Sequence, residues 1–306
     1  MNLIVILGPT ASGKTKLATH LAYEINGEVL SADSRQIYTG MDIGTGKDLN
    51  EYNVNGKLIP YHLINIRNAG DDYNIADYQR DFDEAIHQVG KHNATPILCG
   101  GTGMYIDAVL SGFQFTRIPI DEQLRKELLL KDKEELISIF NELPSDYTHL
   151  ADTSTHKRLI RAIEIASYLQ KHPFEFADLP QFKATIIGLK IDRELRRERI
   201  TKRLQERLQQ GLIEEVQALL DKGISAEKII FYGLEYKLIT QYLLHEFSYD
   251  EMVAKLEVAI HQFAKRQMTY FRKMERDGHE IHWIDASTPL NEQLDAIKSL
   301  LRSKEV

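Results

Sequence analysis

The sequence predicts an α/β protein in which a mostly parallel sheet is flanked by helices and interrupted by a helical insertion domain. Three features support this fold class: apolar runs alternate with helical periodicity, Gly-rich turns follow two of those runs, and the middle of the chain is helical, charged and broken by prolines. In a parallel sheet, ligands gather at the carboxyl ends of the strands. We therefore expect the functional residues to follow the strands directly.

The individual elements follow from the spacing of apolar residues. Residues 3–7 are predicted to form a buried strand, and a helical pattern then runs through Leu17, Leu21 and Ile25. The other strands are expected to end near 29–31 and to cover 63–66, 95–99, 184–191 and 281–284. Helices are expected over 102–110, 193–220, 250–274 and 290–301.

The change in composition after residue 117 divides the chain into segments. Charged helical sequence there is punctuated by Pro119, Pro144, Pro173 and Pro180. The predicted organisation is a first part of the core over 1–117, a helical insertion over 118–182, and the rest of the core with C-terminal helices over 183–306.

Composition sets limits on the class of protein. A chain of 306 residues with 43% apolar residues can bury a normal core, and its net charge of -7 argues against a surface coated in positive charge. The single cysteine, Cys99, excludes an intrachain disulfide and a cysteine cluster for zinc, which fits a reducing cytoplasm. The run at 3–7 is too short for a membrane span, so no membrane association is expected. A monomer is the simplest expectation.

A phosphate-binding loop follows the first strand. The pattern G-x-x-x-x-G-K-[ST] lies here between a strand and a helix, where its backbone amides and the positive end of the helix bind a phosphate chain. Lys14 adds a charge, and the Thr15 hydroxyl can hold Mg²⁺. The alternative is an ordinary Gly-rich turn with an exposed lysine. The loop predicts a P-loop NTPase-like core whose diphosphate site comprises Gly8, Pro9, Thr10, Ala11, Ser12, Gly13, Lys14 and Thr15.

Two other strand ends carry groups that suit catalysis. Asp33 lies in the segment 31–38 after the second strand, and Thr102 lies in the segment 100–105 after the fourth. In a P-loop sheet these segments flank the phosphate end of the ligand, which places a carboxylate and a hydroxyl near the reacting centre. The alternatives are a helix N-cap for Asp33 and a simple turn for 100–102.

Together these motifs resemble those of the bacterial tRNA dimethylallyltransferases, also called tRNA isopentenyltransferases, over nearly the whole chain. The resemblance also includes Ile-Tyr-Thr-Gly-Met-Asp-Ile-Gly-Thr at 37–45, Lys-Arg-Leu-Ile-Arg-Ala-Ile-Glu at 157–164, Gly-Leu-Ile-Glu-Glu-Val at 211–216 and Ala-Lys-Arg-Gln-Met-Thr-Tyr-Phe-Arg at 264–272. It implies transfer of a dimethylallyl group from dimethylallyl diphosphate to the exocyclic amine of the adenosine immediately 3' of the anticodon, without hydrolysis of a nucleoside triphosphate.

The resemblance also implies roles for single residues. Asp33 matches the base that deprotonates the adenine amine, Thr102 a contact near the bridging oxygen of the diphosphate, and Arg203 a further diphosphate ligand. These roles suit the chemistry, because the amine is a weak nucleophile and the leaving diphosphate gains charge. Contacts with the anticodon stem-loop of tRNA are expected from Asp33, Ser34, Arg35, Gln36, Thr102, Lys157, Arg158, Arg161, Lys265, Arg266 and Gln267.

The chain departs from the family pattern in one motif. Many members carry Gly-Tyr-Arg where this chain has Gly233, Leu234 and Glu235, so leucine and glutamate replace an expected basic contact. No Cys/His zinc-finger segment follows Val306, which is expected of the shorter bacterial form.

Two basic clusters are candidates for contact with RNA phosphates. Residues 190–207 hold eight basic residues against four acidic ones, and the second cluster lies within 265–276. The alternative for the first is a solvated helix with surface ion pairs. Near the second, Phe263, Tyr270 and Phe271 either stack on splayed bases or belong to the core.

Two other functions would use the same loop. A small-molecule P-loop kinase would bind ATP and Mg²⁺ but needs a phosphoryl acceptor site and an arginine-bearing lid. A noncatalytic nucleotide switch would bind RNA or protein, but the sequence has no clear Asn-Lys-x-Asp guanine-reading motif. A prenyltransferase is the favoured function, and the kinase is its alternative.

Overall fold

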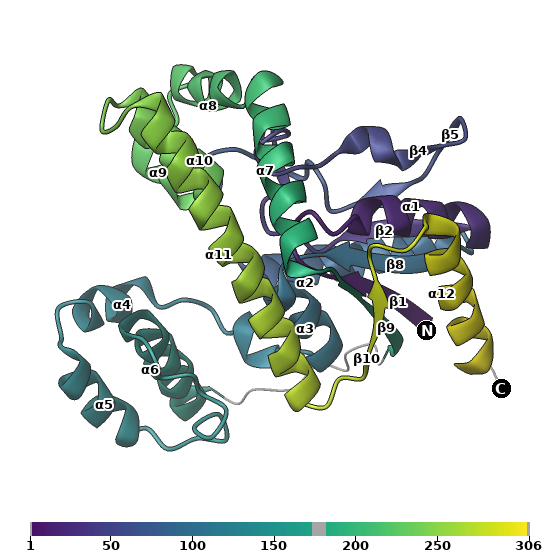
Figure 1. Cartoon of the computed structure of the whole chain (residues 1–306). Coiled ribbons are helices and arrows are strands. Elements are labelled where there is room, and N and C mark those ends of the chain that lie inside the picture. The colour runs from purple at the N-terminus through teal and green to yellow at the C-terminus, as the bar shows by residue number, and fades with distance from the viewer. Residues whose placement is uncertain (1, 173–181, 305–306) are drawn as a thin grey trace. The chain divides into compact units, whose positions relative to one another are not determined.

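The computed structural model describes residues 2–172 and 182–304, and its centre is a sheet of six strands (Figure 1). All neighbouring strands are parallel, in the order β10-β9-β1-β8-β2-β6. These strands are β1 (Asn2–Leu7), β2 (Gly27–Ser31), β6 (Tyr61–His62), β8 (Thr95–Gly100), β9 (Lys183–Lys190) and β10 (Ile281–Asp285). The predicted α/β fold with a mostly parallel sheet is confirmed.

Helices and short pairs of strands complete this part of the chain. The helices are α1 (Lys14–Ile25), α2 (Ile75–Lys91), α3 (Gly103–Ser111), α7 (Arg193–Gln209), α8 (Leu212–Asp221), α9 (Ala226–Phe231), α10 (Leu234–Leu243), α11 (Tyr249–Arg276) and α12 (Leu290–Lys304). The short pieces are β3 (Tyr38–Thr39), the 3₁₀ helix η1 (Leu49–Tyr52), β4 (Asn53–Val54), β5 (Lys57–Leu58) and β7 (Arg67–Asn68). No helix of the described residues is long and apolar enough to cross a membrane.

Both faces of the sheet are covered because successive side chains of a strand point to opposite sides. Ile4 and Ile6 of β1 belong to a core with residues of α1 and α12. Leu3, Val5 and Leu7 belong to a second core with residues of α2, α3 and α11. The first strand is therefore buried on both faces, as the continuous apolar run predicts.

A third core joins the helices α7 to α11. It contains Tyr232, Tyr236 and Ile260, and it also includes Ile37 and Tyr38 from the segment that follows β2. The helical cluster therefore holds the chain that leaves the carboxyl end of β2.

The predicted third strand is displaced from its expected position. The strand was expected over 63–66, but β6 covers Tyr61–His62 and pairs with β2. Leu63 and Asn65 have φ of 64° and 57°, in the left-handed region, and an extended strand cannot continue through them.

The single long helix expected over 193–220 is two helices, α7 and α8. Gly211 separates them with φ of 99°. A glycine in this conformation ends a helix readily because it has no Cβ to clash, so the helical periodicity on both sides belongs to different helices.

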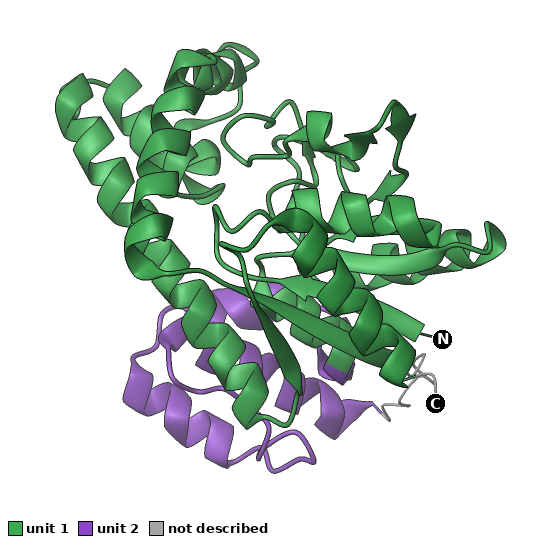
Figure 2. Ribbon diagram, turned by 45° about the vertical axis from the view of Figure 1, so that its right-hand side comes forward, with its two compact units in different colours: residues 1–110, 181–306 green, residues 111–180 purple. Residues whose placement is uncertain are grey.

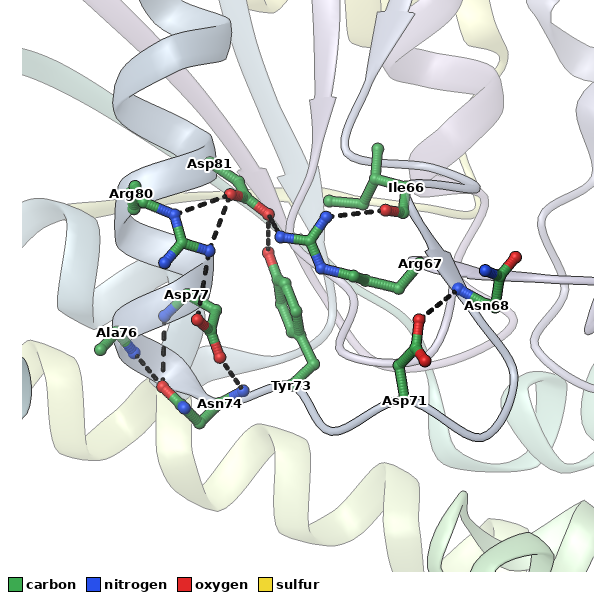
Figure 3. Close-up of polar contacts among 10 residues, drawn as sticks. All are labelled: Ile66, Arg67, Asn68, Asp71, Tyr73, Asn74, Ala76, Asp77, Arg80 and Asp81. Atoms are coloured by element: carbon green, nitrogen blue, oxygen red, sulfur yellow. Dashed lines mark hydrogen bonds and ion pairs between the residues drawn. The ribbon is translucent and has the colours of Figure 1, made fainter. Parts of the chain in front are cut away.

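A polar network fixes the chain between β7 and α2 (Figure 3). The side chain of Asn74 accepts the backbone N–H of Asp77 at 3.2 Å, while the Asp77 carboxylate accepts the backbone N–H of Asn74 at 3.0 Å. The carboxylate of Asp81 accepts hydrogen bonds from Arg67 at 2.8 Å and from the Tyr73 hydroxyl at 3.0 Å. These contacts set the start of a helix that covers the sheet.

The chain forms two compact units, coloured separately in Figure 2. The first comprises Met1–Leu110 and Gln181–Val306, and the second comprises Ser111–Pro180. The second unit has its own core, which includes Leu136, Phe140 and Ile163. Its described elements are the 3₁₀ helix η2 (Gln114–Arg117), α4 (Glu122–Leu128), α5 (Lys133–Asn141) and α6 (His156–Lys171).

The ends of this unit differ from the predicted insertion over 118–182. The guanidinium of Arg161 in α6 donates to the carbonyls of Thr116 at 3.5 Å and Ile118 at 2.6 Å, which ties the segment before residue 118 to the second unit. Phe182 instead packs edge-on against Phe82, with ring centroids 5.8 Å apart, within the first unit. The predicted breaks at Pro173 and Pro180 lie outside the described residues.

Candidate active site

A cavity of about 500 Å³ lies at the carboxyl ends of β1, β2 and β8 in the first unit. The residues predicted from separate motifs meet here: its walls include Thr10, Lys14, Thr15, Asp33, Ser34, Arg35, Gln36, Thr102, Arg203, Arg266 and Gln267. The other predicted loop residues, Gly8, Pro9, Ala11, Ser12 and Gly13, shape the P-loop without lining this cavity.

The backbone of the P-loop is arranged for an anion. Ala11 and Gly13 have φ of 61° and 85°, which turns the chain back on itself before α1. The N-cap of α1 is Gly13, with no side-chain hydrogen bond to the helix and no acidic residue in its first turn. The first amides of the helix and its positive dipole end are therefore available to a phosphate group.

Lys14 supplies the charge of the loop. Its Nζ donates a hydrogen bond to the carbonyl oxygen of Pro9 at 2.8 Å, which holds the side chain across the loop. Burial lowers the pKa of Lys14 to about 8, and the nearby Arg203 contributes in the same direction. The ammonium group is still charged at neutral pH, in a place where a bound anion would favour the charge.

Asp33 and Thr102 face the cavity from neighbouring strand ends. The carboxylate Oδ1 of Asp33 accepts the backbone N–H of Arg35 at 2.9 Å, and the hydroxyl of Thr102 accepts the backbone N–H of Ser34 at 3.1 Å. Residues 34–37 form turns, so the alternative of a helix N-cap for Asp33 is wrong. The aspartate instead forms an Asx turn.

The two strand ends approach each other closely because β8 ends in glycine. A methyl group at Gly100 would lie 2.1 Å from the carbonyl oxygen of Ala32, so no side chain fits there. The backbone N–H of Thr102 also donates to that carbonyl, at 3.1 Å. The contact sets the position of Thr102 beside Asp33.

The side chains of Arg35 and Gln36 are placed differently. Arg35 lies over the ring of Phe231 at 5.4 Å, and Phe231 is 64% exposed. Gln36 accepts from the hydroxyl of Ser31 at 2.9 Å and donates to the carbonyl of Gly46 at 3.1 Å. Arg35 thus presents its charge at the cavity, whereas the amide of Gln36 is occupied within the protein.

Gln267 of α11 connects the P-loop to the end of β8. Its Oε1 accepts the backbone N–H of Thr10 at 2.8 Å, and its Nε2 donates to the carbonyl of Gly101 at 3.0 Å. The side chain is 7% exposed. Gln267 was predicted to contact tRNA, but both ends of its amide bind the protein, so its structural role is to hold the P-loop and the loop after β8 together.

Gln267→Glu is expected to lower the rate of the prenyl transfer implied by the sequence motifs about tenfold above neutral pH, because a carboxylate repels the carbonyl of Gly101. A protonated carboxyl donates to that carbonyl as the amide does, so the ratio of variant to wild-type rate should recover as the pH falls. The matched control is Gln293→Glu: Gln293 is a buried glutamine whose Nε2 donates to Thr288 O at 2.7 Å, outside the cavity. A rate ratio that is independent of pH for Gln267→Glu would contradict this role.

Glu215 positions a loop of the cavity. It belongs to a motif noted in the sequence, but the sequence did not indicate this role. Its carboxylate accepts the backbone N–H groups of Asp42, Ile43 and Gly44 at 2.7, 2.7 and 2.9 Å, and the hydroxyl of Tyr236 at 2.7 Å. It therefore fixes the loop whose next residues, 45 and 46, line the cavity. The only sequence signal was its place in the Gly-Leu-Ile-Glu-Glu-Val motif.

The basic helix α7 combines core and cavity residues. Ile200 and Leu204 are buried, while Lys202 is exposed and pairs with Glu206 at 3.9 Å. Arg203 lines the cavity and forms an ion pair with Asp48. The solvated-helix alternative therefore describes part of this stripe, and Arg203 belongs to the site.

The aromatic residues of α11 divide between the two predicted alternatives. Phe271 is buried in the core, whereas Phe263 is 39% exposed, with Arg266 over its ring at 5.9 Å. Tyr270 is half-buried, and its hydroxyl donates to Asp107 at 3.0 Å. Lys265 and Arg266 are exposed, so they are accessible to a large ligand.

The three basic residues predicted on α6 belong to the second unit and differ in their partners. Lys157 is exposed, and Arg158 pairs with Asp152 at 2.8 Å on the surface. Arg161 donates to backbone carbonyls and lies 3.3 Å from Glu164. The side chain of Arg161 therefore stabilises its own unit, whereas Lys157 forms no ion pair with the residues that the structure describes.

These features define a protein with a P-loop fold, in which the loop lysine, a carboxylate and a hydroxyl line one cavity. The profile of the IPP transferase family matches residues 36–274, and that of isopentenyl transferase matches residues 1–65. The chain belongs to the IPP transferase family.

Individual relatives agree with this assignment. The tRNA dimethylallyltransferase 2 of Bacteroides fragilis is 52% identical over 301 residues, which cover 98% of each chain. That of Shewanella sediminis is 45% identical over 292 residues, which cover 95% of this chain and 96% of the relative. The crystal structure of tRNA isopentenylpyrophosphate transferase from Bacillus halodurans superposes with a TM-score of 0.72 at 31% identity, covering 99% of this chain and 96% of that one.

Proposed function

We propose that this chain transfers the dimethylallyl group of dimethylallyl diphosphate to the exocyclic amine of the adenosine immediately 3' of the anticodon in tRNA, releasing diphosphate. The main support for the proposal is that Lys14, Asp33 and Thr102 line the same cavity. Relatives named tRNA dimethylallyltransferase, among them one from Porphyromonas gingivalis that is 53% identical over 97% of this chain, support the same reaction. The kinase alternative receives no support from these relatives.

In this proposal the P-loop holds the diphosphate as the leaving group. The amides at the start of α1, the ammonium of Lys14 and the guanidinium of Arg203 surround it. As the allylic carbon–oxygen bond breaks, the diphosphate gains negative charge, and donors fixed in advance stabilise that charge without reorganisation. The Thr102 oxygen accepts from Ser34, so its own hydrogen is available to the bridging oxygen.

Asp33 acts as the base. The nitrogen of the adenine amine forms a bond to the allylic carbon, and its proton passes to the carboxylate as the diphosphate departs. One carboxylate oxygen is held by the N–H of Arg35, while Oδ2 has no hydrogen bond to the described residues. That second oxygen is the atom we assign to proton transfer.

Thr15 would hold Mg²⁺. It lines the cavity in the position that P-loops use for the metal, and its hydroxyl is a hard oxygen ligand of the kind that Mg²⁺ accepts. The described residues contain no group of three or more His, Cys, Asp or Glu that could hold a metal. This donor set fits Mg²⁺ bound mainly by substrate phosphate oxygens and water, where it would neutralise charge on the diphosphate.

The test is the reaction itself. Unmodified tRNA and dimethylallyl diphosphate labelled in the prenyl group should give labelled tRNA, and tRNA with guanosine in place of the target adenosine should give none. Equal labelling of both tRNAs would contradict the assigned acceptor. Phosphoryl transfer from ATP to a small molecule, without prenyl transfer, would favour the kinase.

The tRNA is proposed to contact the exposed cations Lys265 and Arg266 in the first unit and Lys157 and Arg158 in the second. We further propose that the protein acts as a monomer in the cytoplasm, the reducing compartment that its single cysteine suits. Sedimentation of the purified protein tests the monomeric state, since a dimer would have twice the mass.

Lys265→Ala is expected to weaken tRNA binding and to reduce the slope of log K against log salt by about 1, because one phosphate contact releases about one counterion. Pyrophosphate affinity should not change. Lys255→Ala is the control, because Lys255 is an exposed lysine of the same helix that lies over Phe247 at 5.6 Å and outside the cluster. Filter-binding titrations at several salt concentrations measure the slope. Equal slopes for the two variants would remove Lys265 from the interface.

A further inference from the structure

The helix α7 presents two arginines to the cavity, and only Arg203 has so far been given a role. Arg207 follows it by four residues, so the two side chains leave the same face of the helix. Both line the cavity, and both also line a smaller hollow that includes Thr10 and Ala11 of the P-loop. Arg207 therefore lies beside the loop that is proposed to hold the diphosphate.

The ends of the two arginines meet at Gly46. A methyl group at this glycine would lie 2.6 Å from Nη2 of Arg203 and 1.7 Å from Nη2 of Arg207. The φ of Gly46 is 62°, a conformation that glycine adopts without strain. The lack of a side chain leaves the space in which two guanidinium groups of like charge come together.

The two arginines differ in how their charges are balanced. Arg203 forms an ion pair with Asp48. The guanidinium of Arg207 forms no hydrogen bond or salt bridge with residues 2–172 or 182–304. Burial lowers the pKa of Arg207, and Arg203 lowers it further. An arginine keeps its proton at neutral pH, so Arg207 is a half-buried cation that a bound anion would stabilise.

Glu235 is the acidic residue in this part of the cavity. It lies in the first turn of α10 and lines both the cavity and the smaller hollow. Burial raises the pKa of its carboxyl, and Arg207 opposes that rise. A negative charge here attracts Arg207 but repels a diphosphate, so the two residues should act on anion binding with opposite signs.

We propose that Arg207 binds the diphosphate group of the prenyl substrate as a second arginine beside Arg203, and that Glu235 weakens this binding by its charge. This inference rests on the proposed function, because it takes the P-loop cavity as the diphosphate site. A guanidinium fork donates two parallel hydrogen bonds from separate nitrogens to two phosphate oxygens, a planar geometry that the single ammonium nitrogen of lysine does not provide. The reaction product, inorganic pyrophosphate, carries the same oxygens and is a direct probe.

Calorimetric titration of the full chain with pyrophosphate tests the proposal. The Kd is expected to rise about tenfold or more for Arg207→Gln, through loss of a charge-assisted hydrogen bond, and to rise less for Arg207→Lys. It should fall for Glu235→Gln. The matched control is Arg199→Gln, which removes the same charge from the same helix outside the cavity, where Arg199 lies 3.5 Å from Ala286 O. This control should keep the wild-type Kd.

The outcomes separate the inference from the function on which it rests. Equal Kd values for wild type and Arg207→Gln would overturn the role of Arg207, and so would equal increases in Arg207→Gln and Arg199→Gln. Weaker tRNA binding with an unchanged pyrophosphate Kd would place Arg207 on the nucleic acid instead. If the wild type binds no pyrophosphate, the diphosphate site itself is wrong. Should Arg207→Gln unfold, Arg207→Lys and Glu235→Gln still give the opposite shifts that the proposal requires.

Discussion

Asp33→Asn is expected to fold, to bind both substrates and to transfer the dimethylallyl group roughly 10² to 10⁴ times more slowly than the wild type. Asparagine has nearly the same size as aspartate and keeps an oxygen that can accept the backbone N–H of Arg35, as Asp33 does at 2.9 Å. It cannot take the proton of the adenine amine. A loss of rate without a loss of binding or folding is therefore the result expected of a base.

Single-turnover transfer of the labelled group measures this rate, and substrate binding and thermal unfolding are measured on the same protein. Asp285→Asn is the matched control. Asp285 also ends a parallel strand and accepts the backbone N–H of Ser287 at 2.8 Å, but it does not line the cavity. Near-normal transfer by folded Asp33→Asn would exclude Asp33 as the base. Its role would then be only to form the Asx turn, which asparagine forms about equally well.

The sheet and the phosphate loop could be predicted because their signals are local. The apolar run at 3–7 and the glycines, lysine and threonine that follow it are consecutive in sequence, and the same segment forms β1, the loop and the start of α1. The third strand was expected over 63–66 but ends at His62, because its end depends on left-handed backbone at Leu63 and Asn65, which hydrophobic periodicity does not report.

The types of residue at the site could be predicted, but their internal partners could not. Gln267 stands among cations on an amphipathic helix, which favours contact with RNA when the sequence is considered alone. Its hydrogen bond to Thr10 joins residues 257 positions apart, and only the packing of α11 on the sheet brings them together. Arg207 has the same property, because its environment comes from Gly46 and Glu235 in distant segments.

Arg161 shows the same limit in the second unit. Its position on one face with Lys157 and Arg158 is a correct inference from helical spacing. Spacing does not reveal that carbonyl groups of residues 116–119 surround its guanidinium. Tertiary contacts decide whether a basic side chain is exposed to solvent or hydrogen-bonded within its own chain. Helical periodicity therefore identifies candidate tRNA-binding residues, but only the fold shows which of them are accessible.

Lys14→Ala is expected to reduce pyrophosphate affinity and turnover by at least roughly 10²-fold, while the variant is no less stable than the wild type at pH 7. Burial lowers the pKa of Lys14 to about 8 from its usual value of 10.5. Between these values the unfolded chain binds more protons than the folded chain, so the contribution of Lys14 to stability rises as the pH increases from about 8. At neutral pH, folding therefore places this charge in an unfavourable site, and alanine removes that cost.

Pyrophosphate binding should show the opposite dependence on pH, because the ammonium that attracts the anion is lost as the pH rises through about 8. The ratio of the Kd of Lys14→Ala to that of the wild type is the measure, since ionisation of pyrophosphate affects both proteins alike. This ratio should be large at pH 7 and should fall toward one above pH 8. Lys14→Arg keeps its charge at higher pH, so its ratio to the wild type should fall over the same range. A ratio near one at every pH for Lys14→Ala would exclude Lys14 from the diphosphate site, and a large ratio that does not change with pH would exclude its ammonium charge as the cause.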